Sequence, residues 1–441
     1  MKKIIHQSKE KGQTLVIMAL VMVGLIGFTA LVVDGGVTLS QRRYDQNAAD
    51  ASSIAGAGEA AYVMEFNDLT YTDFTCSNAT VLSAMSNAEA EAISRAAANN
   101  FTLDNDISDD HGVLVECILE DTGSYIDKYV QITSMVTSEV DKTFANAVFN
   151  SDLQSTTTSV ARIRPRTSLA YGNAIASIGM GCGSGNGGVF LSGNIGIQVT
   201  GGGVFSNTCI ETNGGIDLTV TPADLGVSYN STFTQNGGSG SISPAPQQVS
   251  DTLPIIEIDP PVCGGGTYAS QVKVKNKDDI TINPGNYSSF KQTGGDLTLN
   301  PGLYCVSGDF DSNGGTLTGN GVTIYMEGGD YGTSGNTEVS LMAPTGLPAD
   351  VAPAITGMLI FVDPSNTGAS VDMRGNAVSS YVGTIYNPEG TISAGGTGSV
   401  MPTINTQMIG KDVVVGGNTS VVINFNSSEN YQVSASLNLE K

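Results

Sequence analysis

The chain contains no tryptophan and only two histidines, His6 and His111, in 441 residues. The second half therefore has no imidazole for acid–base catalysis. The six cysteines form no C-x-x-C pair and no cluster with histidine, which argues against a structural zinc site. Basic residues are scarce as well, 19 against 42 acidic residues, and the formal net charge is −23. A surface of this sign repels nucleic acid and anionic lipid headgroups, so we expect neither as a partner.

Long hydrophobic runs are also absent, with one exception near the N-terminus. Twenty residues without a charge extend from Thr14 to Val33, which is enough for a helix to cross about 30 Å of hydrocarbon. The positive-inside rule places the basic segment before this run in the cytoplasm, so the rest of the chain should be exported. A cleaved signal peptide is the alternative, but the run is longer than a typical signal and no small-residue cleavage site closes it. We expect a single-pass anchor in the cell membrane. The basic segment contains Lys2, Lys3, Lys9, Glu10 and Lys11.

Three short motifs surround this span: KGQTLVIMAL leads into it, VVDGG closes it, and RRYDQNAADAS follows from Arg42. In this order they resemble the N-terminal domain of the TadE/TadG-like proteins of Flp (tight adherence, Tad) pilus assembly. The resemblance covers about fifty residues and implies a bacterial, membrane-anchored protein of the cell surface or of a pilus. Cleavage after Gly12, as in secreted pseudopilins, would place Ile17 at the fifth mature position, where those proteins usually carry glutamate. A pilin-like filament subunit is therefore the less favoured alternative.

Alanine dominates the segment after the span, which predicts that the helix continues without a break. Small residues recur four positions apart, and such faces let another helix approach closely. Two interpretations are open: the face packs against sister subunits or Tad pilus components, or it lies on the chain's own next domain. Residues 1–66 would then form the cytoplasmic tail, the transmembrane helix and a stem helix. The spaced pairs are Ala48 and Ser52, Ala51 and Ala55, and Ala57 and Ala61.

Residues 67–168 carry mixed signals that predict a small α+β domain. The alanine-rich stretch 84–100 predicts a helix, and alternating apolar residues predict strands at 112–119, 125–136 and 155–163. A further short helix is expected at 142–149. The acidic run Asp104–Asp110 could form a calcium loop, but a solvated charged face is the preferred interpretation.

Glycine separates this domain from the rest, because only nine of the 55 glycines precede Pro165. Residues 169–441 contain short alternating runs punctuated by glycine and asparagine, which predict many short strands joined by tight turns. The unit INPGNY at 282–287 returns as LNPGLY at 299–304, a spacing that suits one coil of a solenoid. We expect an all-β, right-handed parallel β-helix, with a β-sandwich or jelly roll as the alternative. The same segments look like the glycine-rich solenoids often found behind this type of anchor.

Two finer expectations concern this region. In the run VTIYM, Val322, Ile324 and Met326 should point inward, while Thr323 and Tyr325 face out, because strand side chains alternate. The proline-rich stretch 241–262 should be an extended excursion or a linker between two portions of the solenoid.

Two of the six cysteines lie in residues 67–168 and four lie in the glycine-rich region, so each segment holds an even number. Fifteen full pairings are possible, and domain membership favours three successive bridges. Disulfides agree with export to an oxidising compartment. The favoured pairs are Cys76–Cys117, Cys182–Cys209 and Cys263–Cys305.

The glycine-rich region offers few residues for chemistry. DFDSNGG contains Asp309, Asp311 and Asn313 at the spacing that begins a calcium loop, but Asn320 stands where an EF-hand needs glutamate. A turn in which Asn313 and Gly314 adopt positive φ is the preferred interpretation. Polysaccharide-cleaving β-helices need converging carboxylates, and no neighbouring pair of that kind is evident. The remaining acidic candidates are Glu327 with Asp330, Asp363, Asp372 beside Arg374, and Glu389.

These observations favour a structural protein over a catalyst. We expect a membrane-anchored, surface-exposed protein of a Tad/Flp system that displays a solenoid for adhesion, without a catalytic site, cofactor or required metal. The alternative from another class is a membrane-tethered carbohydrate-active enzyme on the same solenoid. Carboxylates that converge in one groove of the folded chain would favour the enzyme.

Overall fold

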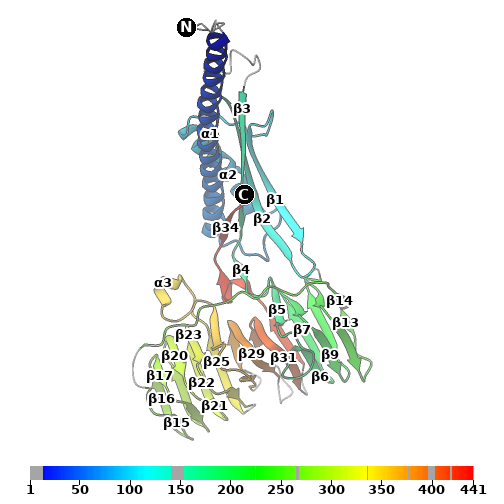
Figure 1. Ribbon diagram of the computed structural model, residues 1–441. Helices are drawn as coiled ribbons and strands as arrows, with labels where there is room; N and C mark the ends of the chain where they lie inside the picture. The colour runs from blue at the N-terminus through cyan, green and yellow to red at the C-terminus, as the bar shows by residue number, and fades with distance from the viewer. Residues whose placement is uncertain are drawn as a thin grey trace, which may run out of the picture.

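The computed structural model describes residues 13–140, 153–223, 225–264, 268–334, 336–375, 378–395, 403–417 and 420–440. It has two parts, a long stem and a solenoid that lies across one end of the stem (Figure 1). The basic segment at residues 2–11, Gly12 and the helix expected at 142–149 lie outside the described residues.

Two helices form one side of the stem. α1 (Gln13–Phe66) continues from the apolar run through the alanine-rich segment, as the sequence predicts. α2 (Ala79–Ala98) begins at Asn78, whose side chain accepts a hydrogen bond from the backbone N–H of Thr80. Its buried residues recur at helical spacing and face α1 and the stem sheet: Val81, Ala84, Ala88, Ala92 and Ala96.

The small-residue face of α1 packs inside its own stem, which decides between the two interpretations of that face. Ser52 donates to the carbonyl of Ala92 on α2 at 2.8 Å, and its hydroxyl lies 2.9 Å from that of Ser134. Gly56 sits so close to α2 that an added Cβ would lie 2.8 Å from the Ala88 carbonyl oxygen. The chain itself thus covers most of this face, while Ala51, Ala55 and Ala61 stay partly exposed.

The other side of the stem is a four-stranded antiparallel sheet in the order β1-β2-β3-β34. The sequence predicted the first three strands but grouped residues 436–440 with the glycine-rich region. In the structure these residues leave the solenoid and pair with β3, so the stem contains both early and late parts of the chain. The strands are β1 (Gly112–Asp121), β2 (Ile126–Val140), β3 (Leu153–Arg164) and β34 (Ser436–Glu440).

The glycine-rich region forms a parallel β-helix, which confirms the favoured fold over the β-sandwich; its right-handed sense stays a prediction. Each full coil contributes strands to three faces, and the strands of each face pair in parallel with those of the next coil. The INPGNY and LNPGLY units occupy successive coils, since Ile282 pairs with Leu299. The 17-residue spacing is therefore one turn of the solenoid.

We call the three faces I, II and III. Face I contains β5 (Asn173–Ser177), β8 (Gly203–Ser206), β11 (Val227–Tyr229), β14 (Gln247–Gln248), β17 (Gly285–Tyr287), β20 (Gly302–Val306), β23 (Val322–Met326), β26 (Met358–Val362) and the first halves of β29 (Thr384–Ala394) and β31 (Met408–Gly417). Face II contains β6 (Gly188–Gly193), β9 (Cys209–Asn213), β12 (Thr232–Asn236), β15 (Val272–Val274), β18 (Phe290–Gln292), β21 (Phe310–Ser312), β24 (Tyr331–Thr333), β27 (Ser370–Met373) and the second halves of β29 and β31. Face III contains β7 (Gly196–Thr200), β10 (Asp217–Thr221), β13 (Ile242–Ser243), β16 (Asp279–Ile282), β19 (Asp296–Leu299), β22 (Gly315–Asn320), β25 (Thr337–Met342), β28 (Ser380–Val382), β30 (Thr403–Asn405) and β32 (Val421–Asn424).

The chain enters and leaves the solenoid near its middle. Face III has the order β13-β10-β7-β32-β30-β28-β25-β22-β19-β16, so the first and last of its strands in the chain, β7 and β32, lie side by side. From β7 the chain winds outward to one end, crosses to the opposite end, and winds back to β32. Figure 1 shows this path, with β13 and β14 at one end, β15 and β16 at the other, and β29 and β31 between them.

The crossing is made by residues 249–263, which we call the strap. This segment overlaps the proline-rich stretch 241–262 that the sequence predicted to be extended. Leu253 is buried against the outer side of face I, and Ile256 and Ile258 pack on the same cluster. The disulfide between Cys263 and Cys305 joins the end of the strap to β20.

The strap overturns one expectation about side-chain direction. Val322, Ile324 and Met326 do point into the solenoid core, but Thr323 and Tyr325 on the opposite side are only 0 and 4% exposed. Tyr325 belongs to the cluster beneath the strap, and Thr323 donates to the carbonyl of Met358. The nearly continuous apolar sequence VTIYM could have indicated that both faces of this strand are buried, because such strands lack the alternation of polar and apolar residues.

Candidate functional site

The apolar part of α1 projects free of the rest of the protein. Among the described residues it is the one helix long and apolar enough to cross a membrane, and none of its most apolar window is buried. Leu15 and Val32 are 76 and 72% exposed, although both are strongly apolar. Such exposure in a charge-free segment of this length fits a lipid environment. This end of the stem is therefore the candidate membrane-facing site.

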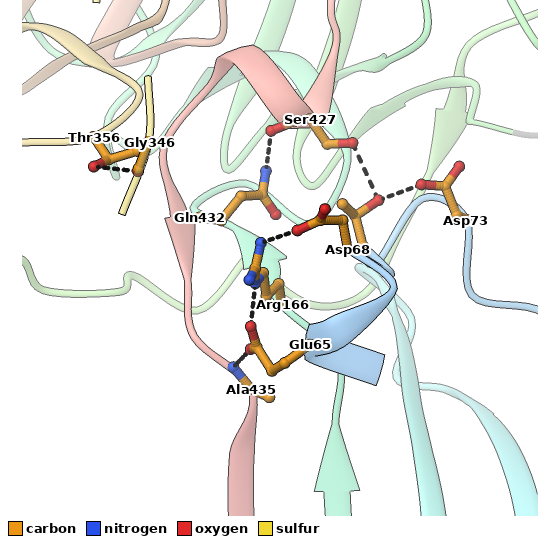
Figure 2. A network of polar contacts seen from close by, with 10 residues as sticks. Glu65, Asp68, Asp73, Arg166, Gly346, Thr356, Ser427, Gln432 and Ala435 are labelled. Carbon is orange, nitrogen blue, oxygen red and sulfur yellow. Dashed lines mark hydrogen bonds and ion pairs between the residues drawn. The ribbon is translucent and has the colours of Figure 1, made fainter. Parts of the chain in front are cut away.

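The opposite end of the stem joins the solenoid through a polar network centred on Arg166 (Figure 2). Arg166 forms ion pairs with Glu65, near the end of α1, and with Asp68 at 3.1 Å. Glu65 also accepts from the backbone N–H of Ala435, which precedes β34. One arginine thus connects the stem helix, the chain entering the solenoid and the chain leaving it.

Further contacts reinforce this junction. The Thr70 hydroxyl lies 3.1 Å from that of Ser427, in a short 3₁₀ helix (Ser427–Glu429), and β33 (Gln432–Val433) pairs with β4 (Thr167–Ser168). Tyr71, Tyr125 and Tyr171 pack together beside the network. Burial, followed by the charges of its neighbours, raises the pKa of Tyr171 to about 12. These tyrosines stay uncharged at neutral pH and add packing contacts to the polar network between the stem and the solenoid.

Face II carries a hollow of about 440 Å³ on its outer surface. Asp311 on β21 and Asp372 on β27 lie on either side of Gly332 in β24, since Gly332 pairs with both. The glycine leaves a gap between the two carboxylates, and an added Cβ there would meet no atom within 4 Å. Asn313 and Arg374 also line the hollow. The sequence listed both aspartates but did not predict that they share one depression.

These carboxylates accept hydrogen bonds from neighbouring groups of the same chain. Asp372 accepts from the Arg374 guanidinium at 2.9 Å, and Asp311 accepts from the Asn313 amide at 2.6 Å. Asp309 accepts from the backbone N–H of Asp330 at 3.1 Å. In DFDSNGG the positive φ values fall on Gly314 and Gly315 and not on Asn313. The motif is therefore a β-strand followed by a glycine turn, and calcium binding at Asp309, Asp311 and Asn313 stays an untested prediction.

The remaining acidic candidates are spread over the solenoid. Glu327 accepts from the hydroxyl of Tyr268, and Asp330 accepts from the backbone N–H of Ser370 at 2.7 Å. Burial acts to raise the pKa of Asp363, but hydrogen bonds from Ser365 and Tyr325 outweigh it and lower that pKa. Glu327 and Asp330 thus connect different coils, while Asp363 stabilises a local turn through Ser365.

Within the described part of the chain, one group of three potential metal ligands lies close together: Cys182, Cys209 and Glu211. The two sulfurs are bonded to each other, which removes the thiolates that a metal would need. The acidic run Asp104–Asp110 is not in that group; it precedes β1, and its Asp110 carbonyl accepts from Thr137.

The structure contains three disulfides, and they are the three successive pairs that the sequence favoured. Cys76 joins Cys117 within the stem domain, while the other two bridges lie in the solenoid. The described residues contain no free cysteine. Together with the exposed apolar helix, the disulfides suggest a membrane-anchored protein with an extracytoplasmic bulk.

Comparison with known families identifies the membrane-facing part. Residues 12–59 match a family model described as "Putative Flp pilus-assembly TadE/G-like". The match covers the apolar segment and the small-residue face of α1, and it ends before the solenoid. It supports the resemblance seen in the sequence and suggests association with a Tad pilus system. Neither the search of curated proteins nor the search of solved structures found a match.

Proposed function

We propose that this chain is a single-pass membrane component of a Tad/Flp pilus system that displays its β-helix outside the membrane for adhesion or envelope scaffolding. The observation that carries the proposal is the continuity of α1. The TadE/G-like match at 12–59 lies on the same unbroken helix that leads from the lipid-facing segment into the stem. The N-terminus would be cytoplasmic, as the basic residues before the span predict.

The geometry supports display at a distance from the membrane. α1 has 54 residues. At 1.5 Å per residue it is about 80 Å long, and about 50 Å of it would stand above a 30 Å hydrocarbon layer. The Arg166 junction and the β3–β34 pairing hold the solenoid across the outer end of this stem. The faces of the solenoid would thereby face the surroundings of the cell and not the lipid.

Protease added to intact spheroplasts tests the orientation. The solenoid and stem should be digested while a cytoplasmic marker protein survives, and full protection of the solenoid would contradict the proposal. Association with the pilus system is tested separately by crosslinking from an exposed position of α1, such as Tyr62, followed by identification of the partner. Recovery of Tad pilus components is the expected result.

The proposed role is non-catalytic. The hollow on face II is the feature that would instead support an enzyme. Asp311 and Asp372 flank a gap, as a membrane-tethered polysaccharide hydrolase would require of its two carboxylates. We favour adhesion because each carboxylate is engaged by a neighbouring side chain within two residues. Release of reducing ends from a polysaccharide, abolished by Asp311→Asn and by Asp372→Asn, would establish the enzyme instead.

A pilin-like filament subunit is a third function that the same N-terminal helix could serve. It requires removal of the basic segment after Gly12, so N-terminal sequencing of the mature protein separates it from a retained anchor. We expect the intact N-terminus, with Lys2 and Lys3 present.

A further inference from the structure

A depression on the described surface lies where faces III and I meet, beside α3 (Pro348–Val351). It has a volume of about 840 Å³, within the usual range of ligand-binding clefts. Its floor is formed by the ends of β19, β22 and β25 and the corners that follow them. Its wall is the segment from Asp350 to Pro353, part of the insertion between β25 and β26.

The floor presents a row of hydroxyl groups. Thr298 pairs with Thr318, and Thr318 pairs with Ser340, so the three lie at the same position of successive parallel strands. Equivalent side chains in such strands repeat about every 4.8 Å. The hydroxyls of Thr298 and Thr318 are 3.1 Å apart, while the exposed Ser340 makes no side-chain hydrogen bond to another described residue. The row offers regularly spaced donors and acceptors.

The repeated P-G-x-Y unit forms one edge of this groove. Pro284 and Pro301 line it from successive coils, and Asn300 donates to the side-chain oxygen of Asn283 at 2.8 Å. Asn320 occupies the next corner, is exposed, and makes no side-chain hydrogen bond to another described residue. The groove therefore combines amide and hydroxyl groups with the flat apolar surfaces of proline rings.

The wall adds aliphatic contacts and little charge. Met342, Val351 and Pro353 contribute apolar surface, and Asp350 is the one charged residue among the lining residues. A carboxylate at the rim of an acidic protein repels polyanions. The four lysines near this end of the solenoid, Lys273, Lys275, Lys277 and Lys291, are not among the lining residues.

We propose that this groove binds a segment of a neutral, linear glycan. Hydroxyl and amide groups that repeat from strand to strand along the solenoid match the hydroxyls that repeat along a sugar chain, and the prolines and aliphatic side chains fit the apolar faces of the rings. This inference rests on the proposed function, because it names the class of ligand through which the displayed solenoid adheres. It assigns recognition to the α3 side of the solenoid and not to the aspartates of face II.

Calorimetric titration of the full chain in nanodiscs of uncharged lipid tests the proposal. The probes are the neutral hexasaccharides cellohexaose and maltohexaose, with an oligogalacturonate of similar length as the anionic comparison. At least one neutral probe should bind, and the anionic probe should bind more weakly. The double variant Asn320→Ala/Ser340→Ala removes two unpaired polar groups and should lower the affinity about tenfold.

A matched control comes from the same outward row of face III. Thr219 and Ser243 pair with each other near the opposite end, and both are exposed. Thr219→Ala/Ser243→Ala should therefore leave the affinity unchanged. The proposal is overturned if neither neutral probe binds, if the anionic probe binds more tightly, or if the two double variants lose affinity equally. Since membrane orientation and Tad association are measured separately, loss of the glycan result leaves the proposed display function standing.

Discussion

Thr323 provides a direct test of whether the 354–358 segment covers the outer side of β23 on face I. Its side chain is fully buried on the outer side of β23. The hydroxyl donates to the Met358 carbonyl at 2.9 Å and accepts from the backbone N–H of Ile355 at 3.0 Å. Replacing Thr323 with aspartate would place an unpaired carboxylate in this buried position. If the 354–358 segment did not lie there, the same change would be harmless.

The expected loss of stability is large. An uncompensated charge in a buried position costs about 3–5 kcal/mol, and the carboxylate cannot donate to the Met358 carbonyl. In a domain of this size 1 kcal/mol shifts the melting temperature by about 2–4 °C, so Thr323→Asp should melt about 10 °C below the wild type. Thr323→Val removes only the hydroxyl and should cost about 1–3 kcal/mol, because the N–H of Ile355 loses its acceptor.

Thermal unfolding followed by circular dichroism measures the effect, with Thr219→Asp as the control. Thr219 also lies on a solenoid strand but is exposed, so its aspartate variant should melt within about 2 °C of the wild type. Equal melting temperatures for Thr323→Asp and Thr219→Asp would show that this position of face I is open to solvent and would refute its burial beneath the 354–358 segment.

Three further predictions concern the strap disulfide, the packing of α1 on α2, and the Arg166 junction. Cys263→Ser opens a bridge that spans 42 residues, and the chain-entropy estimate predicts a loss of about 4 kcal/mol in non-reducing urea unfolding; an unchanged midpoint would contradict it. Gly56→Val brings a side chain against the Ala88 carbonyl and should destabilise the stem by about 2 kcal/mol more than Gly58→Val, where no atom lies within 4 Å; equal effects would argue against the α1–α2 packing. Arg166→Met should speed hydrogen exchange in β33 and β34 at least severalfold, and unchanged protection would show that the junction does not depend on this arginine.

Local sequence patterns predicted much of the fold. The alanine-rich and alternating segments of the stem predicted α2, β1, β2 and β3, because each buries one face against a single partner layer. The P-G-x-Y repeat predicted the coil, because a solenoid strand sees the same neighbours at every turn. In face III the alternation is clean: DLTL at 296–299 buries Leu297 and Leu299 and exposes its polar residues.

The features that sequence could not supply depend on contacts between distant segments. The sequence of residues 249–263 predicts an extended segment, but no local pattern predicts that this segment packs across the outer side of face I. The apolar outer row of that face, which includes Tyr325, Phe361 and Tyr386, was a signal of a second buried layer. Likewise, Asp311 and Asp372 share a hollow only because an intervening coil places a glycine between them.

The entry of the chain at the middle of the solenoid makes its two halves depend on each other. The coils at 173–248 have one free edge until β31 and β32 arrive, and the contact between Gln407 and Asn173 spans 234 residues of sequence. The stem sheet is completed still later, by β34. Because β31, β32 and β34 complete sheets begun much earlier in the chain, neither the solenoid nor the stem can be completed until the last residues are available, and such long-range pairings form slowly. The disulfide between Cys263 and Cys305 joins the end of the strap to β20 and so anchors the crossing segment to the half of the solenoid that follows it.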